Sequence, residues 1–416
     1  MTGQVDVVVT GLGATTPLGG DVASTWEALL AGRSGVRRVD DQFEWVERHQ
    51  LPVKIAAPLA VSPTEVLSRV QARRLDRCEQ VALVAAKEAW ADAGLGEPGN
   101  AQVEPERLGV VVGTGIGGAV TLLDQDDLLE SGGLRKVSPL TVPMLMPNGP
   151  AAWVGIEYQA RGGVHAPVSA CASGAEALAW ALNLLRSGKV DVVLAGGAEA
   201  CITGITVAGF VQARTLSQRN DEPERASRPF DVERDGFVLG EGAGVMVLER
   251  AEFAAARGAK VYGRLAGAGL TADAYHITGP EPEGVGQSRA IAAAVQDAGL
   301  KPSDIGHVNC HATSTVAGDV GETRAVRKAL GDHPILTAPK SSMGHLVGAA
   351  GAVESIFTLL SVKEGIIPAT LNLEKLDPGV ELDVVSGEPR KVDLTAAVCD
   401  SFGFGGHNAA VAFMKA

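Results

Sequence analysis

The chain of 416 residues carries a formal net charge of −13, and this acidic balance argues against nonspecific binding to nucleic acid. Aromatic residues make up only 4% of the sequence whereas 52 residues are glycine, a composition that favours helices packed closely on a sheet, as in an α/β fold. The length suffices for one large core or for two fused subdomains.

Cysteine usage and the lack of long apolar runs favour a cytoplasmic enzyme. The five cysteines include no CxxC pair, which is typical of a reducing compartment. The first residues show neither the basic nor the apolar segment of a signal peptide. No run approaches roughly 18 consecutive apolar residues, so we expect no membrane span. The cysteines are Cys78, Cys171, Cys201, Cys310 and Cys399.

The first half of the chain alternates strand patterns with helical patterns. Short β-branched runs flanked by glycine predict strands at 7–9, 109–113, 191–196 and 244–249. Stretches rich in alanine and leucine predict helices at 80–93 and 176–185. This alternation is typical of a parallel sheet that is covered by helices on both faces.

The second half repeats this order of patterns. Strand patterns recur at 261–267, 309–311 and 407–413, and the segment 339–360 resembles 167–185. We infer an internal duplication with a joint near 250–260, which divides the chain into halves at 1–255 and 256–416. The stretches 31–75 and 118–165 interrupt the alternation, and we expect them to form a cap over the site.

Cys171 is a candidate nucleophile. It lies between an apolar run at 164–168 and a helix that we expect to begin near Ala172. The N-terminus of a helix favours the thiolate, and its free N–H groups stabilise a developing oxyanion. Ser169 and Ser173 supply a tight turn of the kind that nucleophiles occupy. A buried, inert thiol is an equally good interpretation of this residue taken alone.

His311, Lys340 and His345 complete a candidate catalytic set. His311 follows a strand pattern and precedes two threonines that can hydrogen-bond a polar ligand, although an imidazole satisfied within a turn is as good an interpretation. We place His345 in the first turn of the helix that follows it, where the dipole leaves a neutral imidazole able to donate to a carbonyl oxygen. A thiol, two imidazoles and an ammonium group in this order suit carbon–carbon bond formation on a thioester.

Two glycine-rich loops border these residues. The loop 401–406, Ser-Phe-Gly-Phe-Gly-Gly, permits close backbone approach and a moving ring, or is simply a turn before the last strand. The loop 113–118 fits the dinucleotide pattern GxGxxG, which is a weak signal. The other candidate residues suggest no hydride chemistry, so we do not expect a nicotinamide cofactor.

Together these motifs resemble the elongating β-ketoacyl-[acyl-carrier-protein] synthases, type I/II, of the thiolase superfamily. The resemblance extends from residue 5 to residue 415 and includes the segments 137–139, 217–229 and 234–242. It implies a thiolase fold, with duplicated βαβαβαβ halves in five α/β/α/β/α layers, assembled as a homodimer. The implied reaction is the decarboxylative Claisen condensation of an acyl thioester with malonyl-acyl-carrier-protein in fatty acid elongation.

The resemblance also implies catalytic roles. Cys171 would hold the acyl chain as a thioester. His311 and His345 would hold the malonyl thioester carbonyl and stabilise the enolate that forms as carbon dioxide leaves. Lys340, paired with Glu354, would orient and tune the two histidines.

Further residues would bind the substrate. The backbone N–H of Phe404 would join that of the nucleophile in the oxyanion hole, and its ring would gate access. Thr313 and Thr315 would bind the phosphopantetheine arm, while Ile116 would border the acyl pocket beside Phe402. We expect no metal and no resident cofactor, because the substrates bring their phosphopantetheine on acyl carrier protein.

Acyl carrier protein, loaded with an acyl or a malonyl group, is the partner that the resemblance implies. Local basic clusters would guide this acidic protein to the entrance, although most such residues taken singly are ordinary solvated charges. We expect no nucleic-acid partner. The residues of these clusters are Arg73 and Arg74 with Arg77, Arg135 with Lys136, and Arg214.

Two residues depart from the family pattern. Ala312 stands where glycine usually follows the first histidine, and Asp400 stands where asparagine often precedes the phenylalanine loop. We expect Asp400 to face backbone partners.

A chain-initiating synthase would carry asparagine in place of His345, a thiolase would carry a second catalytic cysteine, and an inactive chain-length factor would lack Cys171. A ketosynthase of a type II polyketide or specialised long-chain lipid pathway stays an alternative.

Overall fold

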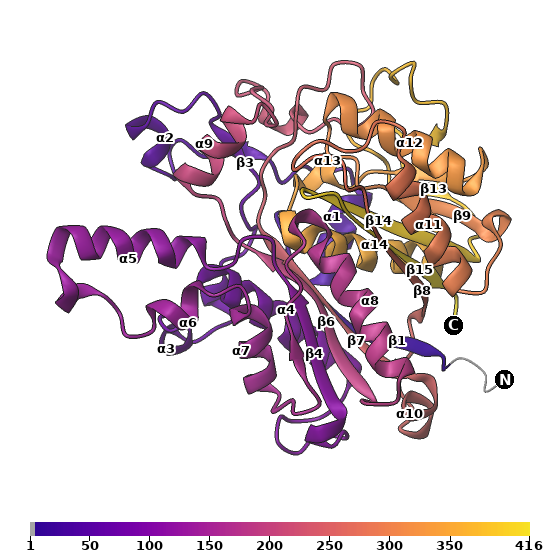
Figure 1. Ribbon diagram of the computed structural model, residues 1–416, viewed down its shortest axis with the longest axis horizontal. Coiled ribbons are helices and arrows are strands. Elements are labelled where there is room, and N and C mark those ends of the chain that lie inside the picture. Colours follow the sequence, from indigo (N-terminus) through magenta and orange to yellow (C-terminus); the bar gives the residue numbers. More distant parts are fainter. Residues whose placement is uncertain (1–4) are drawn as a thin grey trace.

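Eleven strands form one mixed sheet in the computed structural model, which describes residues 5–416 (Figure 1). The strands β4 and β6 are buried along their whole length, as valine-rich runs covered on both faces should be. In chain order the strands of this sheet are β1 (Val7–Thr15), β4 (Leu108–Gly113), β5 (Val164–His165), β6 (Val192–Glu199), β7 (Gly242–Arg250), β8 (Gly263–Ala272), β9 (Ile305–Asn309), β10 (Ile335–Thr337), β12 (Asp383–Val384), β14 (Ala396–Gly403) and β15 (His407–Met414).

Both halves of the sheet place their strands in the same spatial order. The first half runs β5-β4-β6-β7-β1 and the second runs β10-β9-β14-β15-β8, with β12 added at its edge. A short antiparallel pairing of β1 with β8 joins the halves, and α10 (Ala251–Ala256) connects them along the chain. The repeated order confirms the predicted duplication. The division at residues 255 and 256 stays a prediction.

The direction of the strands differs from the prediction of a parallel sheet. The strand β4 pairs in parallel with β5 and β6, and β9 pairs in parallel with β10 and β14. In contrast, β7 and β15 run antiparallel to both of their neighbours. A valine-rich run indicates that a strand is buried, but it does not indicate whether the strand runs parallel or antiparallel to its neighbours. The tight turn after β14 makes β15 its antiparallel hairpin partner.

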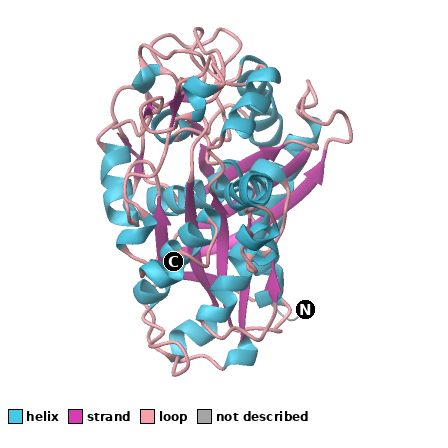
Figure 2. Cartoon of the chain, turned by 90° about the vertical axis from the view of Figure 1, so that its left-hand side faces the viewer, coloured by secondary structure: helices cyan, strands magenta, loops and turns pink. Residues whose placement is uncertain are grey.

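Helices and the two halves of the sheet alternate in five layers. Two helices, α4 (Arg77–Ala93) and α7 (Gly149–Glu157), cover the outer face of the first half, while α11 (Val285–Asp297) and α12 (Val316–Leu330) cover that of the second. Between the halves lie α8 (Ser173–Arg186) and α14 (Ala350–Glu364), and Figure 2 shows the strands with helices on both sides. This arrangement is the predicted five-layered α/β fold.

The two central helices touch each other directly. The helix α14 is buried continuously from Ala350 to Val362, as a helix enclosed by two sheets must be. Gly174 in the first turn of α8 permits the contact, because a Cβ atom there would lie 2.7 Å from the backbone nitrogen of Ala352. The loops that precede these helices are thereby brought face to face.

The two interrupting segments form only part of the predicted cap. The stretch 31–75 folds into β2 (Arg37–Arg38), α2 (Trp45–Arg48), β3 (Ile55–Ala56) and α3 (Arg69–Ala72), and its apolar side chains join a cluster that also contains Cys171. In the second stretch, α7 and β5 belong to the layers of the fold, because their apolar residues pack on α4 and β4. The remainder, α5 (Ala119–Gly132) and α6 (Thr141–Leu145), projects from the body as an arm (Figure 1).

Candidate active site

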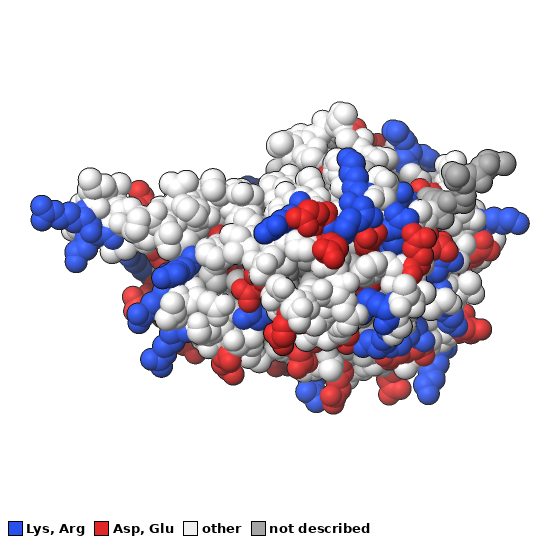
Figure 3. Space-filling view, turned by 90° about the horizontal axis from the view of Figure 1, so that it is seen from below, with Lys and Arg blue, Asp and Glu red and all other residues white. Residues whose placement is uncertain are grey.

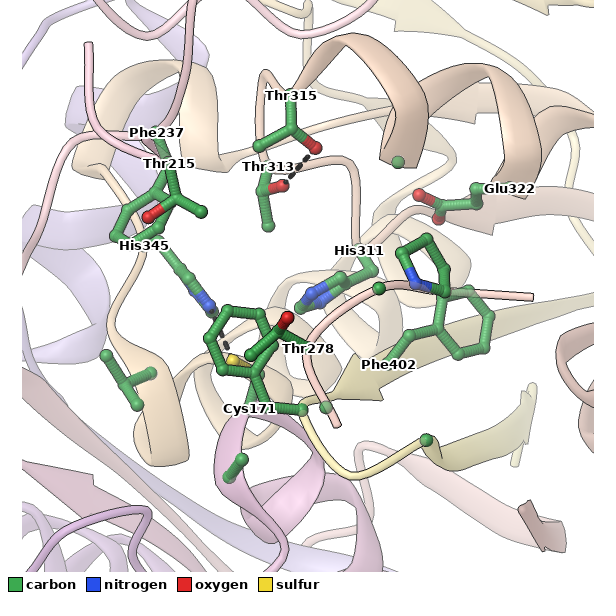
Figure 4. Close-up of a pocket in the computed structure, with 18 of the residues that line it drawn as sticks. Cys171, Thr215, Phe237, Thr278, His311, Thr313, Thr315, Glu322, His345 and Phe402 are labelled. Atoms are coloured by element: carbon green, nitrogen blue, oxygen red, sulfur yellow. Dashed lines mark hydrogen bonds between the residues drawn. The ribbon is translucent and has the colours of Figure 1, made fainter. Parts of the chain in front are cut away.

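Cys171 lies in a tight turn before α8. The turn is a 3₁₀ segment at Ala170–Ala172, and the α-helix begins two residues after the cysteine. The hydroxyl of Ser173 accepts a hydrogen bond from Ser169 N–H at 2.9 Å and donates to the carbonyl of Ala170 at 2.7 Å. Ala170 has φ of +52°, which is uncommon for a residue with a Cβ atom. This turn presents the thiol to a cavity (Figure 4).

The two candidate histidines meet at the thiol. His345 Nε2 lies 2.9 Å from Cys171 Sγ. The rings of His311 and His345 stand edge to face with their centroids 5.3 Å apart (Figure 4). His311 follows β9, so the site combines the turn before α8 in one half with two loops of the other half.

The position of His345 differs from the prediction. His345 precedes a 3₁₀ turn at Val347–Ala349, and α14 begins only at Ala350, so the residue is not in a first helical turn. Gly344 has φ of +69° and Val347 has φ of +47°, and these left-handed residues interrupt the helical pattern. His345 N–H donates instead to the carbonyl of Val238 at 2.7 Å.

A buried ion pair lies behind the histidines. Lys340 Nζ donates to both carboxylate oxygens of Glu354, at 2.6 and 2.8 Å. Lys340 opens the short helix α13 (Lys340–Met343), and Glu354 lies in the second turn of α14. Neither side chain lines the cavity, so the lysine acts on the site through its charge.

Both imidazoles are neutral. Burial, and after it the charge of Lys340, holds the pKa of His345 well below its usual value. The pKa of His311 is lowered by the same two causes and by His345. The expected neutral state is therefore found, but desolvation and a nearby cation produce it and not a helix dipole. Each neutral ring keeps one N–H that can donate to an oxygen.

The thiol of Cys171 is not a resting thiolate, in contrast to the expectation. Burial raises its pKa to about 12, although Lys340 and the backbone N–H groups of Phe404 and Cys171 act to lower it. Desolvation of the charged form outweighs these groups because the turn is enclosed. The same two N–H groups point toward the sulfur, and their predicted role as an oxyanion hole stays a prediction.

A cavity of about 390 Å³ extends from the thiol. The predicted substrate residues Ile116, Thr313, Thr315 and Phe402 line it together with Phe404. The hydroxyls of Thr313 and Thr315 lie 3.1 Å apart on the wall of the cavity (Figure 4). The structure thus brings together all of the predicted residues that were expected to meet the substrate.

Several lining residues were not singled out from the sequence. Phe237 packs its ring edge to face on His345 with centroids 5.4 Å apart, and its place in the long motif 234–242 was a signal that could have identified it. Other residues of this kind include Phe210, Thr215, Thr278, Gln287 and Glu322. They come from segments without any recognisable spacing.

The ligand atoms of Cys171, His311 and His345 lie within 4.8 Å of one another, a set of donors that zinc accepts. The ammonium group of Lys340 adds a positive charge beside all three, which opposes binding of a dication. The donor set therefore fits a metal poorly. The absence of a metal stays a prediction.

The predicted basic residues do not form one patch. Arg73, Arg74 and Arg214 are exposed, and Arg214 immediately precedes the cavity residue Thr215. Arg77, in contrast, binds Glu241 with Nε at 2.7 Å and Nη2 at 2.6 Å, so it is a structural residue.

Arg135 and Lys136 lie beyond the far end of α5. That helix of 14 residues separates them by about 20 Å from the cavity wall at Ile116. Figure 3 shows basic side chains at the tip of the projecting arm. These two residues are therefore not at the entrance of the cavity in their own chain.

Two family models match most of the chain. The model described as the N-terminal domain of β-ketoacyl synthase matches residues 4–254, and the model of the C-terminal domain matches residues 262–374. A 3-oxoacyl-[acyl-carrier-protein] synthase 2 of Mycobacterium tuberculosis is 47% identical over 98% of this chain and 96% of its own length. A protein of the same name from Synechocystis is 43% identical over 98% of both chains.

Solved structures agree with these relatives. A β-ketoacyl synthase from Burkholderia phymatum has a TM-score of 0.91 at 36% identity and covers 99% of this chain and 100% of its own. A type II polyketide synthase ketosynthase, solved with its acyl-carrier protein and bound to the hexaketide, has a TM-score of 0.90 at 30% identity over 100% of both chains. With the site geometry, these matches show that the chain belongs to the β-ketoacyl synthase family and has its thiolase-type fold.

Proposed function

We propose that this chain condenses an acyl thioester, held on Cys171, with malonyl-acyl-carrier-protein and releases carbon dioxide and a β-ketoacyl-acyl-carrier-protein. The observation that carries the proposal is the hydrogen-bonded contact of the thiol with one neutral imidazole, with a second neutral imidazole packed against the first. The names of the relatives at 42–47% identity support the same reaction.

The first half-reaction loads the enzyme. Cys171 Sγ attacks the acyl thioester carbonyl, and the resulting oxyanion accepts hydrogen bonds from the N–H groups of Cys171 and Phe404. The tetrahedral intermediate collapses with loss of the phosphopantetheine sulfur, which takes the thiol proton. His345 stabilises the sulfur as negative charge develops, because its Nε2 lies at 2.9 Å.

The second half-reaction makes the carbon–carbon bond. The malonyl thioester loses carbon dioxide, and the electrons of the broken bond form an enolate. The enolate oxygen accepts hydrogen bonds from the N–H groups of His311 and His345. Neutral donors suit this step, since an imidazolium would protonate the enolate. The enolate carbon attacks the thioester on Cys171, the sulfur leaves, and a proton from solvent restores the thiol.

The substrate enters as an acyl group on a phosphopantetheine arm. Thr313 and Thr315 offer two hydroxyls to the polar arm on one wall of the cavity. Apolar side chains, which include Ile116, Phe210 and Phe237, surround the thiol and suit a saturated chain. The enzyme itself needs no resident cofactor in this scheme.

We assign the reaction to fatty acid elongation. The alternative is chain extension in a polyketide pathway, and it is supported by solved polyketide ketosynthases that are 30–31% identical to this chain. The two pathways differ in whether the product is reduced before the next cycle. Elongation of saturated acyl primers, with no turnover of β-ketoacyl primers, would support fatty acid elongation. The reverse preference would support a polyketide pathway.

We further propose that the enzyme works as a homodimer in the cytoplasm. Apolar side chains are exposed on the arm and beside the edge strand β5, and Leu134 at the tip of the arm is 82% exposed. A second copy would cover these side chains and pair with the free edge of β5. None of the helices within residues 5–416 is long and apolar enough to cross a membrane.

The proposed function is tested with purified components. The chain is mixed with carrier protein that bears a saturated acyl group and with malonyl-loaded carrier protein, and the product is identified by mass spectrometry. We expect a β-ketoacyl product longer by two carbons and one equivalent of carbon dioxide. Acyl transfer or hydrolysis without a new carbon–carbon bond would contradict the proposal.

A further inference from the structure

Two buried carboxyl groups hold the backbone at His311. His311 N–H donates to Asp400 Oδ1 at 2.8 Å, and the next amide, that of Ala312, donates to Glu322 Oε2 at 2.7 Å. Asp400 lies in β14 and Glu322 lies in α12, so two elements clamp the same two-residue segment. Both side chains are buried.

One oxygen of each carboxyl group does not accept a hydrogen bond from the backbone. Glu322 Oε1 and Asp400 Oδ2 are buried and have no N–H or O–H donor as long as both groups are ionised, and the Cys310 thiol beside Glu322 is only a weak donor. The two groups lie within hydrogen-bonding reach of each other, and two carboxyl groups can form that bond only if one carries a proton. One shared proton therefore replaces a buried repulsion by a hydrogen bond and supplies a partner to both remaining oxygens.

We propose that Glu322 and Asp400 form a carboxyl dyad which shares one proton and positions His311. The positioning role rests on the proposed function, whereas the shared proton does not. An asparagine at position 400, as the family resemblance would suggest, could donate to Glu322 from its amide without any titratable proton. In this chain the same bond depends on a proton that can be lost.

The surroundings keep the dyad singly protonated at neutral pH. Burial, and after it the neighbouring Asp400, raises the pKa of Glu322 well above its usual value, and burial also raises the pKa of Asp400. Lys340 favours ionisation of both, whereas Asp319 opposes ionisation of Glu322 and Glu354 opposes that of Asp400. The titratable and charged groups facing the dyad are Lys340 from α13, Glu354 from α14, Asp319 from α12, Cys310 and His311 after β9, and Cys399 from β14.

Loss of the shared proton at alkaline pH has a defined consequence. Two negative charges would then face each other beneath His311 without a hydrogen bond between them. Their repulsion separates β14 from α12 at the point where both hold the His311 segment. The stabilisation of the enolate should therefore weaken as the pH rises.

Two single variants imitate the protonated dyad. Asp400→Asn and Glu322→Gln each replace the shared proton by an amide N–H, and each leaves the pair with a single negative charge. One pH unit above the pKa of the dyad, the wild type loses the proton in about nine molecules of ten, which corresponds to a decline in decarboxylation of about tenfold. In both variants this alkaline decline should move to higher pH.

The proton itself is observable without substrate. Infrared spectroscopy of the resting wild type should show the carbonyl band of a protonated carboxyl group at neutral pH, and alkaline titration should remove it with the apparent pKa of the rate decline. Because burial also raises the pKa of Glu79 to about 8, the band of the dyad is identified from the difference between the wild-type spectrum and that of each amide variant. A third variant, Asp400→Leu, removes both the acceptor of His311 N–H and the dyad itself, so it should lower the rate of decarboxylation at every pH and should not show the alkaline decline of the wild type.

Three outcomes would overturn the dyad. One is an alkaline decline that stays in place in both amide variants, and another is a wild-type spectrum that has no protonated-carboxyl band beyond those of the amide variants. The third is a dependence of wild-type activity on K⁺ or Na⁺ that both variants lose, since a cation would then lie between the two oxygens. If no variant and no wild type decarboxylated malonyl thioesters, the proposed function would fail, and the infrared titration would still decide whether the proton is shared.

Discussion

The imidazole of His345 and the thiol of Cys171 are 174 residues apart in the chain and 2.9 Å apart in space. Each comes from the loop before one of the two central helices, and each half of the chain supplies one partner. Because burial raises the pKa of the thiol to about 12, this contact joins two neutral groups at rest. The sulfur becomes reactive when a thioester carbonyl enters and takes up its developing charge.

Replacement of the nucleophile should separate the half-reactions. Cys171→Ala should abolish condensation while the fold is kept, and Cys171→Gln, whose side chain resembles an acylated cysteine, should retain decarboxylation of the malonyl thioester. Intact mass after incubation with an acyl thioester should show one acyl group on Cys171. Labelling at Cys310 or Cys399 is not expected, because both thiols are buried and neither lines the cavity.

Removal of either imidazole should affect the second half-reaction most. In His311→Ala and His345→Ala, loss of one donor to the enolate should lower the rate of decarboxylation by about 10²–10³. Acyl transfer to Cys171 should be affected less, since its oxyanion is stabilised by backbone N–H groups. Equal loss of both half-reactions in a folded His345 variant would refute this division of labour.

The charge of Lys340 should set the acid limit of activity. Its removal raises the pKa of His311 and His345 toward the usual value, so the rate of decarboxylation should begin to fall at a higher pH. Lys340→Met alone also leaves the buried Glu354 unpaired, a change that typically costs about 3–5 kcal/mol of stability. The double variant with Glu354→Gln removes that cost and is the variant in which to measure the pH profile. An acid limit that stays in place would show that the lysine acts only on the fold.

Charge reversal at exposed arginines should slow the reaction with carrier-bound substrates. Arg214→Glu and Arg73→Glu should lower kcat/KM for acyl-carrier-protein substrates, and the loss should shrink at high salt. Turnover of short pantetheine or coenzyme A thioesters should change little. The matched control is Lys301→Glu, since this exposed lysine lies before β9, at the end of the strand opposite His311. An equal loss in the control would assign the effect to net charge.

Acid should destabilise the fold through His307. Burial lowers the pKa of this histidine to about 4, although its Nδ1 contacts the carbonyl of Ile335 at 2.8 Å. The unfolded chain takes up a proton below pH 6.5 while the folded chain does not, so stability falls as the pH drops from about 6.5 to about 4. The shift of about 2.5 units corresponds to about 3 kcal/mol. Denaturant unfolding across this range should show a smaller decline in His307→Asn than in the wild type.

Much of the site was predictable because its residues lie in short motifs at strand ends. Cys171, His311 and Lys340 stand where buried strand patterns meet helical patterns, and loops at strand ends are where catalytic groups gather in α/β proteins. The direction of β7 and β15 was not predictable, since alternation of burial is the same in both directions. The ionisation of Cys171 was also beyond the sequence, because it depends on how completely the loop 401–406 encloses the turn.

The basic residues illustrate a different limit. Runs such as Arg135-Lys136 are visible in the sequence, but their distance from the site depends on the projecting helix α5. Arg77 resembles its neighbours Arg73 and Arg74 in sequence, yet Glu241, 164 residues further along, holds it in place. Long-range partners decide which charges are free to meet another protein.

The repeated strand order places Cys171 and His345 at equivalent points of the two halves, each in the loop that enters a central helix. A symmetric pair of identical halves would present the same residue twice at this meeting point, either two thiols or two imidazoles. Neither combination could both hold an acyl group and stabilise an enolate. Divergence of the two copies therefore placed two different reactive groups where the halves meet, and neither half retains the chemistry by itself.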